Sequence, residues 1–392
     1  MSGTYVYADN AATTRVSQRA LAAAMPFFRE SFGNPSSIHS RGAACASAVL
    51  KARQQVQLAL GADKVGEIYF TSGGTESDNW AISGAAEMGE RSGRRHIITS
   101  AFEHHAVLNT CAYLERKGFE ITYLPVGKEG LISPGQVEKA LREDTCLVSI
   151  MAANNEIGTV QPIGDIGSLC RERGVLFHTD AVQAVGNMPI NVEKMNIDLL
   201  SLSGHKLHAP KGVGALYCRR SIDLPSLIFG GGQERGRRAG TENVPAIAAL
   251  GEAITEICEG MEEKNARVGE MRDRLMEGLL KIKGTYVNGS MEKRLPGNLN
   301  ITFKGVEGES LVLTLDMKGI AASTGAACTG GSVNASHVLT AIGLDPADAR
   351  STLRISLNGE NTDDDIGYML SVIPGVIDRL RELSPLWYED EK

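Results

Sequence analysis

The sequence predicts an α/β fold, with a mostly parallel sheet in a large domain and a smaller α+β domain after it. Between about residues 65 and 220, short apolar runs alternate with helical segments of ten or more residues. This alternation is typical of a parallel sheet that helices cover on both faces. With 392 residues, the chain is long enough for two domains. We expect residues 15–255 to form the large domain, and residues 1–14 plus 256–392 to form the small one.

The strands expected in the large domain are short, apolar runs bounded by polar residues or glycine. They cover residues 67–70, 96–100, 119–124, 146–151, 175–178, 197–201 and 213–217. Helices are expected after the first two of these runs and between the fourth and the fifth. One runs through Ala86, one runs through Leu114 with Gly118 as its cap, and one spans residues 163–173 with Gly174 as its cap.

The chain then changes to long helices with few strands. Residues 244–279 are expected to form one long helical stretch, either straight or kinked, that links the two domains, because its apolar residues fall on one face at helical spacing. These residues are Ile254, Ile257, Met261, Val268, Met271 and Leu275. Further strands are expected at 299–303 and 352–356, and further helices near 308–317, 336–342 and 363–382.

Composition and charge narrow the possible partners and the compartment. The net charge is −7 and there is no long basic run, which argues against nucleic acid or an anionic membrane as a partner. No apolar run reaches the roughly 20 residues of a membrane span, and the first residues show no signal peptide. The seven cysteines are scattered without a C-x-x-C pair, so we expect the reducing environment of the cytoplasm.

Lys206 is the first candidate functional residue. It follows the apolar run 197–201 and lies where a buried strand would end. Burial favours the neutral amine, which is a nucleophile toward carbonyl groups. A Schiff base with pyridoxal phosphate is the best-known use of such a lysine. The alternative is an ordinary surface lysine after a strand.

Asp180 and Gln183 follow another expected strand end. Because ligands of open α/β sheets sit beyond the carboxyl ends of the strands, these side chains should lie near Lys206. The Asp180 carboxylate could hold the protonated ring nitrogen of pyridoxal, and Gln183 could reach the ring hydroxyl. A helix cap or a solvated turn would also explain Asp180.

A glycine-rich turn at residues 72–76 could bind a phosphate. It contains Gly74 and Thr75 and leads from an expected strand into a helix, whose N-terminus offers free N–H groups and a positive potential. Ser203 and His205, which flank Lys206, could donate to the same phosphate. The pattern G-x-x-x-x-G-K is absent, so this is not a Walker loop.

Two further strand ends carry side chains suited to a cofactor. His104 could stack on the pyridoxal face, although a histidine at a helix start can also be solvated. Asn155, in the segment 154–158, could contact the ring hydroxyl or a substrate carboxylate, although asparagines also form turns. His205-x-x-His208 and His104-His105 could instead bind a metal, but they lack the spacing and the glutamate of a zinc protease.

Taken together, these motifs resemble the group I cysteine desulfurases of the NifS/IscS type, which belong to the class V aminotransferase superfamily. The resemblance covers essentially the whole chain, including residues 383–387, and rests on residues 7–14, 32–37, 71–77, 154–158, 203–206 and 238–243. It implies a homodimer with the pyridoxal-phosphate-dependent transferase fold of type I. The implied cofactor residues are Gly74, Thr75, His104, Asn155, Asp180, Gln183, Ser203, His205 and Lys206, with Thr241 reaching the phosphate of the neighbouring subunit.

Cys328 is the residue that points to the reaction. It lies in residues 323–332, a run of small residues with three glycines, which suits a thiol on a mobile loop that carries sulfur outward. A plain connecting loop is the alternative. The other six cysteines lie in helix or strand patterns. The family usually has serine where this chain has Thr324, Ala326 and Gly330, but the thiol is retained.

The resemblance implies conversion of L-cysteine to L-alanine. Lys206 would hold the cofactor and remove the α-proton, His104 would stack on the ring, and the sulfur would pass to Cys328 as a persulfide. Arg354 and Asn155 would bind the substrate carboxylate, although the arginine that usually follows is absent at Gly359. The acceptor would be an iron–sulfur scaffold protein or another carrier, and the persulfide could help ligate an iron–sulfur cluster. Selenocysteine lysis, another pyridoxal-phosphate lyase or transaminase reaction, and an idle regulatory protein are the alternatives.

Overall fold

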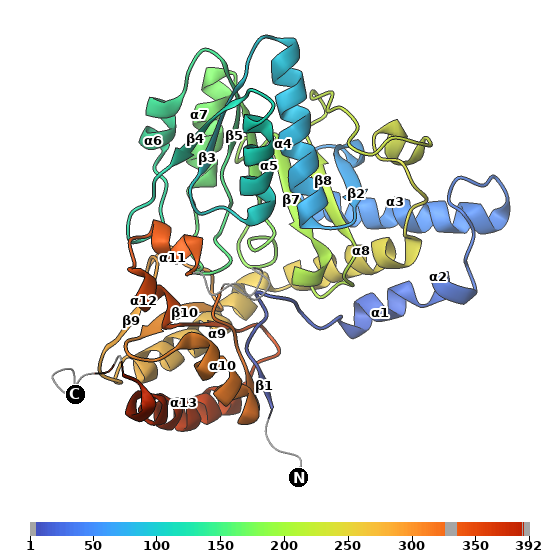
Figure 1. The fold of residues 1–392 in the computed structure, drawn as a ribbon. Coiled ribbons are helices and arrows are strands. Elements are labelled where there is room, and N and C mark those ends of the chain that lie inside the picture. The colour runs from blue at the N-terminus through green and yellow to red at the C-terminus, as the bar shows by residue number, and fades with distance from the viewer. Residues whose placement is uncertain (1–4, 326–334, 386, 388–392) are drawn as a thin grey trace.

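A mostly parallel sheet of seven strands forms the centre of the larger part of the chain (Figure 1). The computed structural model describes residues 5–325, 335–385 and 387. The strand order is β2-β8-β7-β6-β5-β3-β4, and strands β4, β3, β5, β6 and β7 pair in parallel. Strand β8 is antiparallel to both of its neighbours. The strands are β2 (Ile68–Thr71), β3 (His96–Ser100), β4 (Glu120–Leu124), β5 (Thr145–Ser149), β6 (Leu176–Asp180), β7 (Leu199–Ser203) and β8 (Gly214–Cys218).

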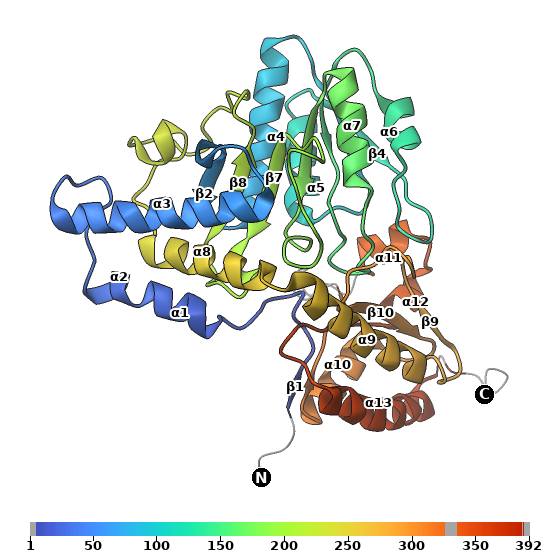
Figure 2. The same ribbon diagram turned by 180° about the vertical axis from the view of Figure 1, so that it is seen from behind.

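Helices cover both faces of this sheet, as the alternation of strands and helices predicted (Figures 1 and 2). Ile97 and Leu147 pack with α4 (Gly74–Arg91) and α5 (His105–Glu115) on one face. Their chain neighbours Ile98 and Val148 pack on the other face. Successive strand residues point to opposite faces, so each strand contributes to two separate cores. The helices of the second face are α1 (Gln18–Ala24), α3 (Ser40–Leu60), α6 (Pro134–Ala140), α7 (Ile163–Arg173) and α8 (Val244–Cys258).

The smaller part has its own hydrophobic core and a three-stranded antiparallel sheet, β12-β10-β9. The N-terminal strand β1 (Val6–Tyr7) pairs in parallel with β11 (Ile320–Ala321), so the beginning of the chain belongs to this core. The proposed division at residue 255 stays a prediction. The remaining elements are α2 (Pro26–Arg29), α9 (Met261–Leu279), β9 (Thr285–Val287), β10 (Asn298–Phe303), α10 (Gly308–Met317), α11 (His337–Ala341), α12 (Pro346–Arg350), β12 (Thr352–Ser356) and α13 (Asp363–Leu383).

Several expected boundaries were wrong by a few residues, and one helix is divided. The stretch 244–279 forms two helices, α8 and α9, because Gly260 between them adopts φ 62° in the left-handed region. Strands β6 and β7 continue to Asp180 and Ser203, so these two candidate residues end their strands rather than follow them. Helix α5 ends at Glu115, before the cap expected at Gly118. Within the described residues, no helix is both long and apolar enough to cross a membrane.

Candidate active site

The candidate residues surround one cavity of about 300 Å³ beside the carboxyl ends of the parallel strands. Among the residues that line it are all ten predicted from the large sheet and from β12, which are Gly74, Thr75, His104, Asn155, Asp180, Gln183, Ser203, His205, Lys206 and Arg354. Thr241 does not line this cavity and is exposed. Cys328 lies outside the described residues. The fold therefore brings six separate segments of the chain together around one cavity, as expected for an open α/β sheet.

Lys206 follows β7 in a single 3₁₀ turn and extends its amine toward the N-terminal segment. Its Nζ donates hydrogen bonds to the carbonyl oxygens of Ala11 at 2.5 Å and Ala12 at 2.6 Å. Gln183 Nε2 donates to the same Ala11 oxygen at 3.0 Å. The N-terminal segment thus forms one wall of the cavity, next to the amine.

Asp180 and His104 lie close to this amine, on the ends of β6 and at the start of α5. Asp180 is buried and accepts the Val182 N–H at 2.9 Å. Burial raises the pKa of the Asp180 carboxyl, and the nearby His104 and Lys206 oppose that rise. Burial lowers the pKa of His104, so this ring is neutral at pH 7, and its Nδ1 accepts the Ala106 N–H at 3.1 Å. The neutral imidazole ring of His104 and the buried carboxyl of Asp180 therefore line the same cavity.

The N-terminus of α4 forms another end of the cavity. Gly74 and Thr75 are the first two residues of this helix, whose leading N–H groups have no partner within the helix. The hydroxyl of Ser203 and the ring of His205 also line the cavity. Burial lowers the pKa of His205 to about 4, so it is neutral at pH 7 and can donate a hydrogen bond without carrying charge. Backbone N–H groups at a helix start with polar side chains beside them suit a phosphate.

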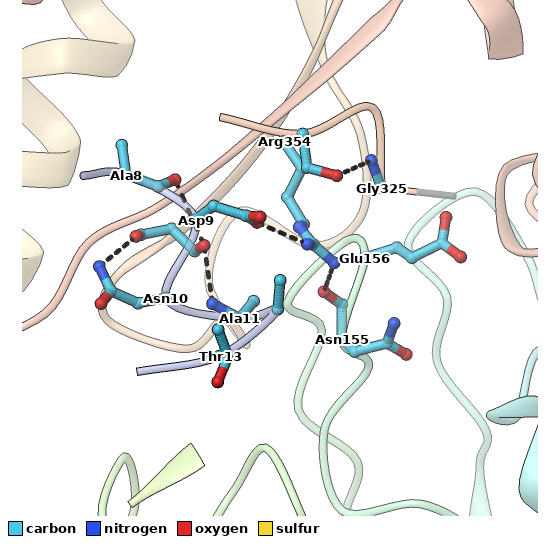
Figure 3. A network of polar contacts seen from close by, with 12 residues as sticks. Ala8, Asp9, Asn10, Ala11, Thr13, Asn155, Glu156, Gly325 and Arg354 are labelled. Atoms are coloured by element: carbon cyan, nitrogen blue, oxygen red, sulfur yellow. Dashed lines mark hydrogen bonds and ion pairs between the residues drawn. The ribbon is translucent and has the colours of Figure 1, made fainter. Parts of the chain in front are cut away.

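Arg354 of β12 is held by two contacts from different segments (Figure 3). Its Nη2 lies 2.8 Å from Asp9 Oδ1, and its Nη1 donates to the Asn155 carbonyl oxygen at 3.1 Å. The residue is 3% exposed, and its Nε has no hydrogen-bond partner within the part of the chain that the structure describes. A buried guanidinium with an unused donor is suited to a carboxylate ligand.

The six cysteines inside the described ranges lie in regular elements, as predicted. They are Cys45, Cys111, Cys146, Cys170, Cys218 and Cys258. Burial raises the pKa of the Cys146 thiol to about 11 and that of Cys111 to about 12. A protonated thiol is a poor nucleophile, so neither of these two is suited to sulfur transfer at neutral pH.

Two residues near the cavity carry chemistry that the sequence motifs did not assign. Asp9 belongs to the motif at residues 7–14 and pairs with Arg354, which follows it by 345 positions. Asp78 lines the cavity from α4 and is 1% exposed. Its position four residues after Gly74, on the buried face that Ala81 and Ala85 continue, was the available signal. A carboxyl on an apolar helix face needs a partner or a ligand.

The structure does not support a metal site at His205 and His208, one of the two histidine pairs that suggested it. His205 Nδ1 lies 3.1 Å from Thr13 Oγ1, and His208 Nδ1 lies 2.9 Å from the Arg15 carbonyl oxygen. Among the described residues, the group with metal-like spacing is instead Asp78, His104 and Asp180.

The cavity fits pyridoxal phosphate. It presents an amine, a buried carboxyl, a neutral ring and a helix start, which are the groups that this cofactor uses for its aldehyde, ring nitrogen, ring face and phosphate. The absence of a side chain at Gly74 is part of this fit, because a Cβ there would lie 2.7 Å from Val182 Cγ2 in the cavity wall.

Comparison with known proteins places the chain in a family. The Aminotransferase class-V family matches residues 6–369. The chain is 54% identical over 381 residues to the cysteine desulfurase IscS of Methanosarcina thermophila, covering 97% of this chain and 94% of that protein. It is similar to the solved structure of a NifS-like protein, with 40% identity, a TM-score of 0.90 and coverage of 96% and 100%. A structure of SspA in complex with cysteine is 41% identical, with a TM-score of 0.80 and coverage of 92% and 100%. The chain therefore belongs to the class V aminotransferase family, among the cysteine desulfurases of the NifS/IscS type.

Proposed function

We propose that the protein is a pyridoxal-phosphate-dependent cysteine desulfurase that converts L-cysteine to L-alanine and holds the sulfur as a persulfide on Cys328. One observation carries the proposal: a single cavity contains the Lys206 amine, the Asp180 carboxyl and the Arg354 guanidinium, which come from three separate segments of the chain. The first two suit the cofactor, and the third suits the α-carboxylate of an amino acid.

When bound, pyridoxal phosphate supplies an electron sink for the α-carbon of the substrate. Asp180 would keep a proton on the ring nitrogen, His104 would cover the ring face, and Gln183 would serve the ring hydroxyl. Gly74, Thr75, Ser203 and His205 would hold the phosphate, and Thr241 would serve the site of the partner subunit. Lys206 would hold the cofactor and then take the α-proton at Nζ, which the Ala11 and Ala12 carbonyls orient.

Substrate orientation is the role proposed for Arg354 and Asn155. The guanidinium is fixed by Asp9 and by the Asn155 carbonyl, so its Nε is available to the α-carboxylate. Asn155 also lines the cavity. Fixing one end of a small amino acid places its side chain in a defined direction, which is what a sulfur-specific reaction needs.

Sulfur transfer is the role proposed for Cys328. Its thiolate forms a bond to the substrate sulfur while the Cβ–S bond breaks, and the electron pair stays on Cβ, which takes a proton to give the methyl group of alanine. The enzyme keeps the sulfur as a persulfide, and no external oxidant or reductant is consumed in this half of the cycle. An acceptor thiol or a scaffold protein then removes the sulfur.

The decisive test is to incubate the purified protein with L-cysteine and a thiol reductant, and to measure alanine and sulfide. Cys328→Ala should abolish both, whereas Cys258→Ala, which removes a half-buried thiol from α8, should not. Lys206→Ala should remove the visible absorption of the lysine-bound cofactor. Alanine production by Cys328→Ala at the parent rate would overturn the persulfide step. Selenocysteine turnover that survives this change would favour a selenocysteine lyase.

We also propose that the protein is a cytoplasmic homodimer that delivers sulfur to an iron–sulfur scaffold protein or another acceptor. The support for a dimer is a set of exposed apolar side chains on and after α1 and α2, namely Leu21, Met25, Phe28, Phe32 and Ile38. Light scattering coupled to size exclusion should give twice the chain mass, and Phe28→Asp should lower it. Persulfidated protein should retain its acceptor in a pull-down, and iron bound through the Cys328 persulfide should depend on that acceptor.

A further inference from the structure

Asp78 places a second carboxyl group beside Asp180. It projects from α4 into the cavity and is 1% exposed. One carboxylate oxygen of Asp78, one of Asp180 and one ring nitrogen of His104 all lie within 4.8 Å of one another. Two carboxylates at this separation, both buried, repel each other strongly when both are ionised. The pair therefore carries one negative charge, as in other buried carboxyl pairs.

The surrounding hydrogen bonds indicate which group keeps that charge. Asp180 accepts the backbone N–H of Val182 at 2.9 Å, and a donor of this kind favours a carboxylate. Asp78 Oδ1 is buried and accepts no hydrogen bond from any residue in the described ranges. The Ser201 hydroxyl does hydrogen-bond to Asp78 and lowers its pKa, but burial and the neighbouring Asp180 outweigh this effect and raise the pKa well above its usual range. Lys206 also opposes the rise in the pKa of Asp180, whereas no cation within the described part of the chain lowers the pKa of Asp78. The environment thus stabilises an ionised Asp180 and a protonated Asp78.

The other groups that face Asp78 do not supply a compensating positive charge. His178 of β6 has its Nε2 3.6 Å from Asp78 Oδ1, but burial lowers the pKa of this histidine to about 3. Its two ring nitrogens already lie near the hydroxyls of Ser149 at 2.8 Å and Ser201 at 3.1 Å. Glu103, just before His104, is a further acid near Asp78, and it supplies no positive charge either.

We propose that Asp78 is a positioning residue that remains protonated beside Asp180, so that a single negative charge faces the ring nitrogen of the cofactor. The proposal rests on the cofactor site proposed above, but it does not depend on the desulfuration step. When Asp180 is the single ionised carboxylate beside the ring nitrogen, one negative charge pairs with one protonated nitrogen, and the nitrogen keeps its proton. A second charge in the same buried space would have no partner.

Infrared spectroscopy of the full-length apoprotein tests the protonation state without turnover. At pH 7, the parent protein should show the carbonyl stretch of a protonated carboxylic acid that shifts when aspartate alone is labelled with ¹³C. Aspartate labelling is needed because Glu103, with a pKa raised to about 8, is also protonated at this pH. The aspartate band should disappear in Asp78→Asn. Its absence from the labelled parent, or its persistence in Asp78→Asn, would overturn the proposal, and the first of these outcomes needs no variant to fold.

The holoprotein offers a second readout, which distinguishes a neutral Asp78 from a charged one. Asp78→Asn replaces one neutral polar group by another of the same shape, so the neutral-pH absorption spectrum of the cofactor should match that of the parent. Asp180→Asn removes the charge and should shift this spectrum and weaken cofactor binding by tenfold or more. An Asp78→Asn protein that behaves like Asp180→Asn would show that Asp78 carries the charge. Failure of alanine production alone would count against the proposed function and leave this spectral comparison intact.

Discussion

A methyl group added at Gly74 is expected to disturb the cofactor cavity specifically. Gly74 is the first residue of α4 and lines the cavity opposite Val182. A Cβ at this position would lie 2.7 Å from Val182 Cγ2 and 3.5 Å from Ser203 Cβ. Ordinary contacts between carbon atoms are about 3.5–4.0 Å, so Val182 would have to retreat by roughly 1 Å.

The magnitude of this effect follows from the surroundings of Val182. Asp180 ends the buried strand β6 and Ala181, which follows it, is also buried, so the backbone has little freedom to move. Overpacking of this kind typically costs about 1–3 kcal/mol. If the strain is relieved by moving Val182 into the cavity, the cost appears in cofactor binding, and the dissociation constant of pyridoxal phosphate should rise by about 5- to 150-fold.

The assay compares Gly74→Ala with a matched glycine in another helix. Gly164 is near the start of α7, and a Cβ there would meet only Met195 Cγ at 3.7 Å, an ordinary contact. Gly164→Ala should be neutral or stabilising by about 0.4–1 kcal/mol, because alanine restricts the unfolded chain. Cofactor affinity of each apoprotein is measured by fluorescence titration. Val182→Ala added to Gly74→Ala should restore much of the lost affinity, because it removes the clashing methyl.

The reasoning about this contact is refuted if Gly74→Ala binds the cofactor as tightly as Gly164→Ala. It is also refuted if Val182→Ala weakens binding by the same factor in the presence and in the absence of the Gly74 change. Either result would mean that the two residues act independently.

Three further changes test other parts of the fold and the site. Glu103 has its pKa raised by burial to about 8, so the folded protein retains a proton that the unfolded chain releases; the contribution of this group to the free energy of unfolding should fall by a few kcal/mol from about pH 5 to about pH 8, and the difference in stability between the parent and Glu103→Gln should change with pH by that amount in denaturant titrations. Arg354→Lys removes the planar guanidinium that contacts Asp9 and the Asn155 carbonyl. The KM for L-cysteine should then rise about 10- to 100-fold in steady-state assays, with cofactor affinity unchanged. Arg53→Leu leaves the buried Glu234 without the partner that it contacts at 2.6 Å; the free energy of unfolding should fall by about 3–5 kcal/mol, and a melting temperature equal to that of the parent would contradict this.

Sequence patterns predicted those parts of the fold that depend on interactions between residues close together in the chain. Ile97 and Ile98 lie in a run of apolar and β-branched residues, and both are fully buried because helices cover both faces of the sheet. Gly174 ends α7 in the left-handed conformation at φ 66°, as its position after Arg173 predicted. Lys206, which lines the cavity, was a candidate from the sequence because a lysine directly after a buried strand is unusual.

The features that the sequence did not reveal depend on contacts between distant segments. Nothing near Asp9 or Arg354 indicates that they form an ion pair, since β12 joins the N-terminal segment only in the folded chain. The antiparallel direction of β8 is also not encoded in its apolar pattern, which resembles that of the parallel strands. Asp78 had a local signal, but its meaning depends on Asp180, which lies on a different strand.

The N-terminal segment explains how a site divided between two sheets keeps a fixed geometry. Its Ala11 and Ala12 carbonyls accept the hydrogen bonds of Lys206, which belongs to the large sheet. Its Asp9 side chain pairs with Arg354, which belongs to the three-stranded sheet. The same segment is anchored on that sheet, because the Ala11 N–H donates to Ser356 Oγ at 2.9 Å. The distance between the amine and the guanidinium is therefore set by a few consecutive residues that contact both. Since catalysis on a small amino acid requires its α-carbon and its carboxylate to be placed together, this segment is as much a part of the site as the two sheets that carry Lys206 and Arg354.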